Sequence, residues 1–372
     1  MKAKSRPPTI LSERRDEEKM KLKKEIINLA KGAKEASGDM LGISTRMKDR
    51  ILREMADALI EKKKEVLKAN KKDIKYAHAI GLSGALIDRL SLDAKKIKQM
   101  ADSLQEIASL ADPVGEVIKA WRRPNGLWIQ KVRVPIGVIA IIYESRPNVT
   151  SDCIGLCFKS GNTLILRGGS EALNSNLTIF YTLQDIIKKY GIAQNIINMV
   201  TTKDRRAVDI LLKLKDDIDL VMPRGGEGLI NRVVKYSRIP VIKHYKGICH
   251  IFVDQWADLN MAEKICYNAK VQRPGVCNAM ESLLVHEDIA TRFLPGILKK
   301  LQAAGVEIRG CPITKKIGKN IKRATSADYR SEYLDLKLSL RIVKDLDAAI
   351  KHINFYGSHH SDSIITENYE NA

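Results

Sequence analysis

The sequence predicts an α/β protein made of two doubly wound domains, with a projecting hairpin ahead of the first sheet. From Gly137 onward, short runs of Val, Ile and Leu alternate with helical segments, which is typical of parallel sheets covered by helices on both faces. The alternation occurs in two successive sets. A chain of 372 residues is also too long for one small core and suits two domains.

Residues 12–110 precede these strands and are predicted to be helical, because apolar residues such as Ile51, Met55 and Leu59 recur at helical spacing. Breaks between the helices are expected at residues that interrupt helices: Gly38, Asn70 and Gly81. The pair Asn125-Gly126 then lies between two alternating runs, which predicts a hairpin within residues 115–135. We expect this hairpin to serve contact between subunits.

The first set of strands is predicted at 138–144, 163–168, 197–202, 218–225 and 239–244, and the second at 250–254, 281–286, 306–310, 338–343 and 362–367. The expected domain boundary lies between the two sets. Residues 1–246 would then hold the N-terminal helices, the hairpin and the first sheet, and residues 247–372 the second sheet. Ligands of such sheets bind beyond the carboxyl ends of the strands.

Composition limits the classes of function. The net charge is +20, but many basic residues fall between apolar positions of the predicted helices, which indicates solvated faces. With only five Phe and three Trp to stack on bases, we expect no nucleic-acid partner, although a positive field can help to collect a small anionic substrate. The six cysteines are scattered without metal-ligand spacing, so we expect neither a metal site nor a disulfide framework.

The sequence also predicts a cytoplasmic location without membrane contact. No apolar run is long enough to span a bilayer, and the N-terminus lacks the apolar core of a secretory signal.

Three strand ends carry residues suited to chemistry. After 138–144, Asn148 is either a helix cap or an amide donor to an oxyanion. In the segment 166–172, Arg167 and two glycines could approach a phosphate, although a glycine pair after a strand is commonly just a turn. A second Gly-rich turn, at 222–228, would lie along the same sheet edge, while the usual GxGxxG dinucleotide fingerprint is absent.

These turns and the loop of Cys277 resemble a known family through the runs PIGVIAIIYESRPNVT, GNTLILRGGSEALNSN, DLVMPRGGEGLI, PVIKHYKGICHIFVD, NAKVQRPGVCNAMESLLVH and SEYLDLKLSLRIV. The chain resembles the gamma-glutamyl phosphate reductases, of the aldehyde dehydrogenase superfamily, from its N-terminal helices to its last residue. This resemblance implies an aldehyde dehydrogenase-like fold with an NADP-binding domain at 1–246 and a catalytic domain at 247–372.

The resemblance implies that Cys277 is the nucleophile. It would attack the acyl phosphate of L-glutamyl 5-phosphate, release phosphate and leave a thioester, which hydride from NADPH reduces to L-glutamate 5-semialdehyde in the second step of proline biosynthesis. A thiolate suits this role because it attacks a carbonyl readily and leaves again. By the same resemblance, Asn148 and the backbone N–H of Cys277 would hold the oxyanion. The segment 241–253 contains no Asp or Glu to activate water, which favours reduction over hydrolysis.

The resemblance also assigns residues to the cofactor. NAD-preferring relatives carry a Lys and, three residues on, a Glu at the adenine ribose, whereas this chain has Arg167 and Ser170. Because Arg and Ser can bind a 2′-phosphate that a carboxylate would repel, NADP is the expected form. The remaining cofactor residues implied by the resemblance are Gly168, Gly225 and Glu332.

Four cationic or ionisable side chains are expected to face the anionic substrate or the departing phosphate: Arg146, Lys243, His244 and Arg273. For Lys243 and His244, a solvated pair of charges at a strand end is an equal alternative. Arg273 could also help to lower the pKa of the Cys277 thiol.

Members of the family continue for a few tens of residues past a segment like 366–372, so the expectation is a truncated chain or one that has lost the tail. The expected partners are the small-molecule substrate, glutamate 5-kinase as a transient partner and further copies of the chain if the tail were present. The alternatives left open are an aldehyde dehydrogenase that acts on a free aldehyde, an inactive truncated homologue, and a non-catalytic or nucleic-acid-binding module.

Overall fold

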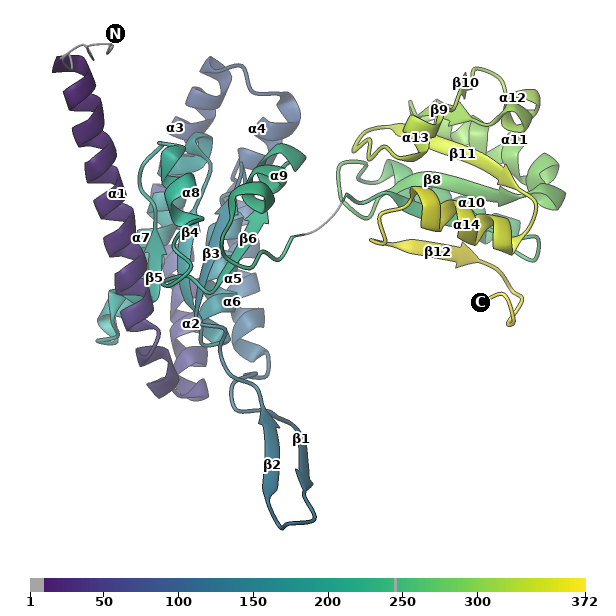
Figure 1. Cartoon of the computed structure of the whole chain (residues 1–372). Coiled ribbons are helices and arrows are strands. Elements are labelled where there is room, and N and C mark those ends of the chain that lie inside the picture. The colour runs from purple at the N-terminus through teal and green to yellow at the C-terminus, as the bar shows by residue number, and fades with distance from the viewer. Residues whose placement is uncertain (1–9, 244–245) are drawn as a thin grey trace, which may run out of the picture. The chain divides into compact units, whose positions relative to one another are not determined.

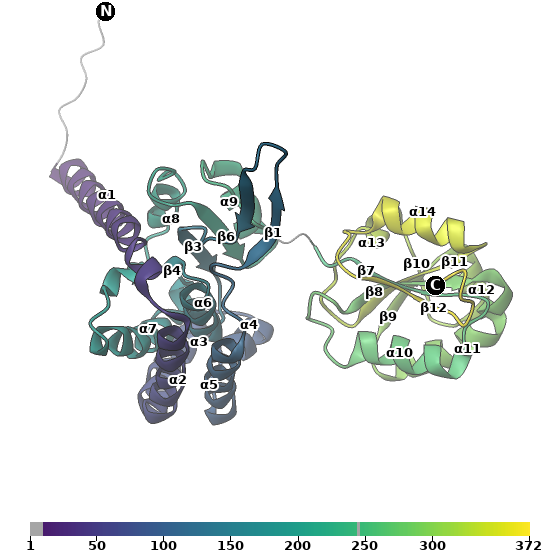
Figure 2. The same ribbon diagram turned by 90° about the horizontal axis from the view of Figure 1, so that it is seen from below.

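The structure is a computed structural model that describes residues 10–243 and 246–372 (Figures 1 and 2). Its internal contacts divide the chain into two compact units, Met1–Lys243 and His244–Ala372, and each is described by itself. Each unit contains a parallel sheet with helices packed against it, which confirms the predicted α/β fold class.

Helices fill the N-terminal part of the first unit: α1 (Ile10–Ala36), α2 (Thr45–Glu61), α3 (Lys63–Ala79), α4 (Gly84–Leu90) and α5 (Ala94–Ser109). Ser44 and Asp93 cap α2 and α5, because their side chains accept hydrogen bonds from Met47 N and Lys96 N. The predicted break at Asn70 is wrong, because Asn70 lies inside α3. Its buried amide donates to the carbonyl oxygen of Leu90 and accepts from Leu92 N, so it joins α3 to the end of α4.

The predicted hairpin is present as β1 (Val117–Arg122) and β2 (Trp128–Val132), which pair antiparallel. Gly126 has a φ of +88°, which a glycine adopts without strain at this turn. Figure 1 shows the hairpin standing away from the rest of its unit, and both Ile118 and Trp128 on it are exposed.

The first sheet is parallel and, among the described residues, has the order β5-β4-β3-β6. Its strands are β3 (Val138–Tyr143), β4 (Thr163–Arg167), β5 (Ile197–Met199) and β6 (Leu220–Arg224), and the connecting helices are α6 (Asn148–Lys159), α7 (Leu173–Lys189), α8 (Arg206–Leu211) and α9 (Glu227–Tyr236). The chain extends the sheet on one side of β3 and then adds β6 on the other. The direction of winding therefore reverses between β3 and β6, where doubly wound sheets bind ligands.

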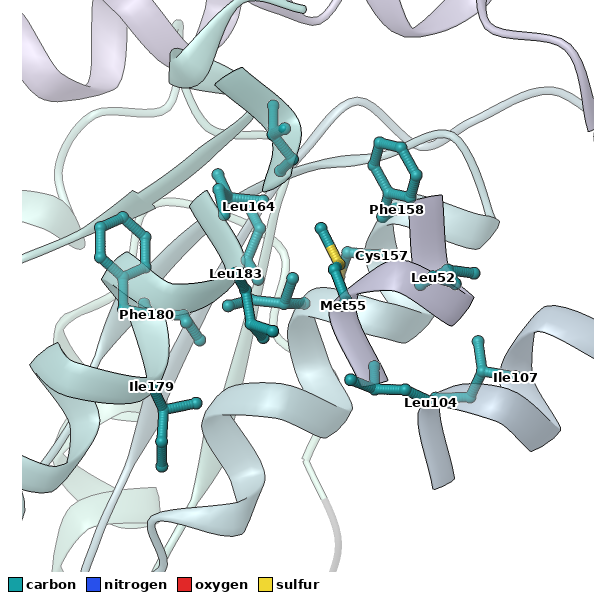
Figure 3. Packing of buried hydrophobic residues seen from close by; sticks show 14 of the residues in the cluster. Leu52, Met55, Leu104, Ile107, Cys157, Phe158, Leu164, Ile179, Phe180 and Leu183 are labelled. Carbon is teal, nitrogen blue, oxygen red and sulfur yellow. The ribbon is translucent and has the colours of Figure 1, made fainter. Parts of the chain in front are cut away.

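Both faces of β3 are buried, which explains why its sequence is continuously apolar. On one face, Ile139 and Ile141 join a cluster that includes Leu104, Phe158 and Leu183 from α5, α6 and α7 (Figure 3). On the other face, alternate residues of β3 pack with apolar side chains of α1, α8 and α9.

The predicted strand at 239–244 is wrong as a full strand. Within 239–243 only Val241 forms a bridge, to Val221, and the pairing uses the Pro240 carbonyl oxygen and the Ile242 N–H. Proline has no N–H to donate to a sheet, which limits how far this segment can pair. The last residue of the predicted strand, His244, lies outside the described residues.

The second unit contains a parallel sheet whose order among the described residues is β10-β9-β11-β8-β7-β12. Its strands are β7 (Cys249–Val253), β8 (Met280–His286), β9 (Glu307–Gly310), β10 (Lys322–Arg323), β11 (Lys337–Val343) and β12 (Asp362–Ile365). The helices are α10 (Leu259–Val271), α11 (Glu287–Ala303), α12 (Pro312–Ile317), α13 (Ser326–Tyr329) and α14 (Leu346–Tyr356). One face packs against α10 and α11 and the other against α14.

Strand β10 was not predicted, because two basic residues give no apolar run.

In the part of the chain that the structure describes, no helix is both long and apolar enough to cross a membrane.

Candidate active site

A cavity of about 280 Å³ lies in the first unit at the carboxyl ends of β3 and β4. Its polar lining comes from the ends of β3 and β4, from the turn after β4 and from the segments that follow β5 and β6: Glu144, Arg167, Ser170, Glu171, Arg205 and Arg232. The cavity therefore occurs at the sheet edge where ligands of doubly wound folds bind. Two of the predicted site residues, Arg167 and Ser170, line this cavity. A third, Gly168, lies between them in the sequence.

Arg167 is buried at the end of β4, with 8% of its surface exposed. Its Nη1 donates to the Gly168 carbonyl oxygen at 2.9 Å and its Nη2 to that of Lys203 at 3.4 Å. The Nε has no hydrogen-bond partner among the described residues, and burial lowers the pKa of this guanidinium. Two backbone carbonyls thus fix the side chain, while one buried donor has no partner among the described residues.

Arg205 is exposed, lines the same cavity and was not predicted as a site residue. It stands in the run Lys203-Asp204-Arg205-Arg206, which gives no sequence signal that separates one cation from the next. Arg206 is committed to Asp204, with which it forms a hydrogen-bonded ion pair. The fold alone distinguishes Arg205 from its neighbour, because only one of the two side chains lines the cavity.

Glu171 follows Ser170. Hydrogen bonds from the turn after β3 fix the position of its side chain. Its Oε1 accepts hydrogen bonds from the backbone N and the Oγ of Ser145, at 2.8 and 2.6 Å. Ser145 has a φ of +39°, a conformation that L residues seldom adopt and that the carboxylate helps to maintain. Glu171 therefore has a structural role in the cavity wall, and Ser170 remains the half-buried hydroxyl beside it.

Gly225 directly follows the last residue of β6 and contacts protein atoms closely. A Cβ at this position would lie 2.5 Å from Glu144 Oε2, and that same oxygen accepts a hydrogen bond from Gly226 N at 2.8 Å. The side chain of Glu144 therefore lies close against this glycine and would have to shift to admit a Cβ. A role for Gly225 toward the cofactor stays a prediction.

Asn148 is the first residue of α6, and the cap residue before it is Pro147. The helix-cap alternative for Asn148 is therefore wrong. Its Nδ2 donates to Asp152 Oδ2 at 3.1 Å, which leaves the second amide hydrogen outside this bond. Burial raises the pKa of Asp152, and the Asn148 side chain itself is exposed.

Cys277 lies in the second unit, on the loop between α10 and β8, at the amino end of the sheet. Its side chain is exposed. Two tight turns shape the loop, through hydrogen bonds from Val276 N to Arg273 O and from Ala279 N to Val276 O. The nucleophile predicted from sequence is thus an accessible thiol on an ordered loop.

Residues at and just before the start of β7 hold the backbone of Cys277. Cys249 Sγ donates to the Cys277 carbonyl oxygen at 3.1 Å, and burial raises the pKa of the Cys249 thiol to about 11, so it stays protonated as a donor. A Cβ at Gly247 would overlap that carbonyl oxygen. Glycine at 247 therefore lets two backbone segments meet, and neither Gly247 nor Cys249 was predicted as a site residue.

Glu332 reaches the same place from the loop after α13. Its Oε1 accepts a hydrogen bond from Gly247 N at 2.9 Å. The structure thus brings together Cys277 and Glu332, which lie far apart in the sequence, through their shared neighbour Gly247.

The predicted substrate residues are distributed over both units. Arg146 is exposed in the turn after β3, and Arg273 is exposed in the loop of Cys277. Lys243 is half-buried at the end of the first unit, and His244 lies outside the described residues. Cys277, Glu332 and Arg273 thus belong to the second unit, and the predicted oxyanion and cofactor residues 148–225 to the first.

Comparisons with known proteins match most of the chain. The model of the aldehyde dehydrogenase family matches residues 17–324. The gamma-glutamyl phosphate reductase of Thermodesulfovibrio yellowstonii is 53% identical over 353 residues, which are 95% of this chain and 84% of that relative. The enzyme of the same name from Clostridium novyi is 50% identical over 353 residues, 95% of this chain and 85% of the relative.

Among solved structures, the gamma-glutamyl phosphate reductase of Thermotoga maritima superposes with a TM-score of 0.90 at 46% identity, covering 93% of this chain and 84% of that one. An NADP-dependent glyceraldehyde-3-phosphate dehydrogenase from Bacillus halodurans, solved with NADP, shares the fold at 20% identity and a TM-score of 0.66, over 94% of this chain and 80% of its own.

Proposed function

The chain belongs to the gamma-glutamyl phosphate reductase family of the aldehyde dehydrogenase superfamily, and we propose that it reduces L-glutamyl 5-phosphate with NADPH through a thioester on Cys277. It is an oxidoreductase of proline biosynthesis, as the names of its close relatives imply. The observation that carries the proposed chemistry is the exposed Cys277 thiol on a loop whose backbone is held by buried neighbours.

In the proposed reaction the Cys277 thiolate attacks the acyl carbon of the substrate. The C–S bond forms, the bond from carbon to the phosphate oxygen breaks, and inorganic phosphate leaves. When bound, the nicotinamide supplies the hydride that reduces the acyl group. The thiolate then leaves again, and L-glutamate 5-semialdehyde is released. In the residue run 241–253 no Asp or Glu is present to activate water, which supports transfer of the acyl group to hydride rather than to water.

The test of this function is the reverse reaction. We expect glutamate semialdehyde to reduce NADP only when phosphate is present, because phosphate must attack the thioester to release the acyl group. Equal rates with and without phosphate would exclude the reductase and favour an aldehyde dehydrogenase that acts on a free aldehyde.

Membership of the aldehyde dehydrogenase family implies a nicotinamide cofactor, and we propose NADP as the form that is used. The residues present fit such a group: the cavity lies at the strand ends, Arg205 lines it, and Arg167 brings a buried Nε without a partner among the described residues. Ser170 adds a hydroxyl in the position where a carboxylate would repel a 2′-phosphate. We propose Gly168, Gly225 and Glu332 as further cofactor contacts.

Arg205→Ala is expected to raise the KM for NADPH about tenfold or more and to leave that for NADH nearly unchanged, because a charge-assisted hydrogen bond to the 2′-phosphate is lost. Steady-state kinetics with both cofactors measure the effect. The matched control is Arg206→Ala. It removes the same charge at the next residue, where the side chain is paired with Asp204 and does not line the cavity. Equal changes for NADPH and NADH, or the same effect in the control, would contradict the assignment.

We propose that the Asn148 amide donates to the oxyanion that forms on the substrate. Asn148→Ala is then expected to lower kcat about 10²- to 10³-fold, since that is the usual cost of removing one oxyanion donor. The control is Asp152→Asn, which keeps a side-chain oxygen for the Asn148 amide and changes only the neighbouring charge. Normal turnover by the alanine variant would show that another group stabilises the oxyanion.

The remaining expectations concern substrate contacts and partners. We propose Arg146, Lys243, His244 and Arg273 as cationic contacts of the anionic substrate. The exposed apolar residues of the hairpin support contact between copies of the chain. A transient complex with glutamate 5-kinase and a cytoplasmic location are proposed because the substrate is a reactive acyl phosphate of a biosynthetic pathway.

A further inference from the structure

We propose that the buried ion pair between Lys270 and Glu281 positions the Cys277 loop and the Glu332 loop relative to each other. Both would be positioning residues, which act through backbone that they hold and not through contact with the substrate. The proposal rests on the function proposed above for Cys277 and Glu332.

The pair encloses the nucleophile loop. Lys270 lies in the last turn of α10, Glu281 is the second residue of β8, and Cys277 lies on the loop between them. Lys270 Nζ and Glu281 Oε2 are 2.8 Å apart, and their side chains are 0% and 1% exposed. The two ends of the loop are therefore joined by an interaction from which water is excluded.

The second oxygen of Glu281 reaches a different segment. Glu281 Oε1 accepts a hydrogen bond from Leu334 N at 2.9 Å. Leu334 has a φ of +51°, a conformation that persists in a bulky L residue only when its surroundings hold it. It lies two residues after Glu332, so one carboxylate fixes both the base of the Cys277 loop and the loop that carries Glu332.

These contacts close a ring of interactions. Glu332 accepts a hydrogen bond from Gly247 N, and Gly247 lies against the Cys277 carbonyl oxygen. Cys277 in turn belongs to the loop whose two ends carry Lys270 and Glu281. Movement of any one of the three segments therefore displaces the others. The thiol and the carboxylate proposed for the nicotinamide ribose would lose their alignment together.

Stability alone is a weak reason for this pair. Burial lowers the pKa of Lys270 and raises that of Glu281, so removal of the two side chains from water opposes their charges. Well-packed apolar residues in place of a buried ion pair are often neutral or stabilising. What apolar residues cannot supply is an acceptor for Leu334 N.

Two double variants separate positioning from stability. Lys270→Met with Glu281→Gln removes both charges but keeps a side-chain oxygen for Leu334 N. Lys270→Met with Glu281→Leu removes the charges and the acceptor. If the pair served only stability, the two variants would be about equally active, because each leaves one buried polar atom unpaired: the side-chain amide nitrogen that Glu281→Gln introduces, or Leu334 N.

We expect the two variants to differ in activity. The leucine variant should have a kcat about 10²-fold below that of the parent chain, the cost of a displacement of about 1 Å at a reacting group. The glutamine variant should retain clearly more activity than the leucine variant. Equal kcat values in the two variants would overturn the proposal.

Hydrogen exchange of the intact chain gives a readout that does not depend on activity. Amides of 330–336 should exchange about tenfold or more faster in the leucine variant than in the glutamine variant, because Leu334 N loses its acceptor. Unchanged exchange at 330–336 would overturn the proposal even if the phosphate-dependent reaction were absent, so failure of the proposed function remains distinguishable.

A control and a second comparison complete the design. Lys48→Met with Asp112→Asn removes another buried pair, 2.9 Å apart in the first unit, and should leave exchange at 271–279 and 330–336 unchanged. If the leucine variant does not fold, the glutamine variant should still exchange faster than the parent at 271–279, because the Lys270 anchor is gone. Parent-like exchange at 271–279 would then reject the proposal.

Discussion

Replacing Cys277 by alanine is expected to abolish reduction of the acyl phosphate while leaving NADPH binding nearly unchanged. The thiol is the proposed site of the covalent intermediate, so its loss removes the reaction path rather than weakening one contact, and we expect kcat to fall on the order of 10⁴-fold or more. The cavity proposed for the cofactor belongs to the first unit, whereas Cys277 belongs to the second. Turnover assays and the change in NADPH fluorescence on binding measure the two properties separately.

The matched control for this substitution is Cys311→Ala. Cys311 is a half-buried thiol of the same unit, next to Thr314 at the start of α12, and its loss should leave turnover within about twofold, as for most substitutions away from a reacting centre. Residual activity of the Cys277→Ala variant close to that of the parent would refute the thioester. Loss of NADPH binding together with turnover would show that the thiol has a structural role.

Local patterns in the sequence were enough to predict most of the two sheets. The strand Val138–Tyr143 is apolar at every position because both of its faces are covered. This pattern can be recognised in the sequence without knowing which strands lie beside it. Residues 239–242 are apolar as well, yet among the described residues of the segment 239–244 only Val241 forms a bridge, and Pro240 has no N–H to donate to a sheet. Apolar character decided neither burial nor pairing in this segment, because Ile239 is buried whereas Ile242 is exposed.

Candidate site residues could be named from the sequence only where a run of residues resembled a known family. Cys277 and Arg167 are of this kind, and their roles stay predictions. Lys270 and Glu281 look like two ordinary charges in a chain that is rich in charge, and their burial as a pair depends on how α10 meets β8. Contacts of this kind require the fold, since no periodicity in the sequence marks them.

Gly247 shows the same limit, and it leads to the second large expected effect. Glycine at this position carries no motif, but a Cβ there would overlap the Cys277 carbonyl oxygen and would lie 2.9 Å from its carbon and 3.1 Å from Glu332 Oε1. Rotation of a side chain cannot relieve an overlap with backbone. Gly247→Ala must therefore displace the Cys277 loop, the loop of Glu332 or both.

We expect Gly247→Ala to lower kcat about 10²-fold or more, because the nucleophile and its neighbouring carboxylate move from their working positions. The thermal midpoint should fall as well, since overpacking of this kind costs about 1–3 kcal/mol. Kinetics at saturating substrate and calorimetry measure these effects. Gly84→Ala, at a position where an added Cβ meets nothing within 4 Å, is the control and should change neither property.

The rate of Cys277 alkylation decides how the Gly247→Ala variant loses activity. If the loop has moved while the second unit stays folded, iodoacetamide should still react with Cys277 but at a rate that differs from that of the parent chain, since the exposed thiol lies in a new environment. A variant with parent-like kcat, midpoint and alkylation rate would mean that the backbone at 247 relaxes without moving Cys277. The close approach of the two segments would then have no part in holding the nucleophile.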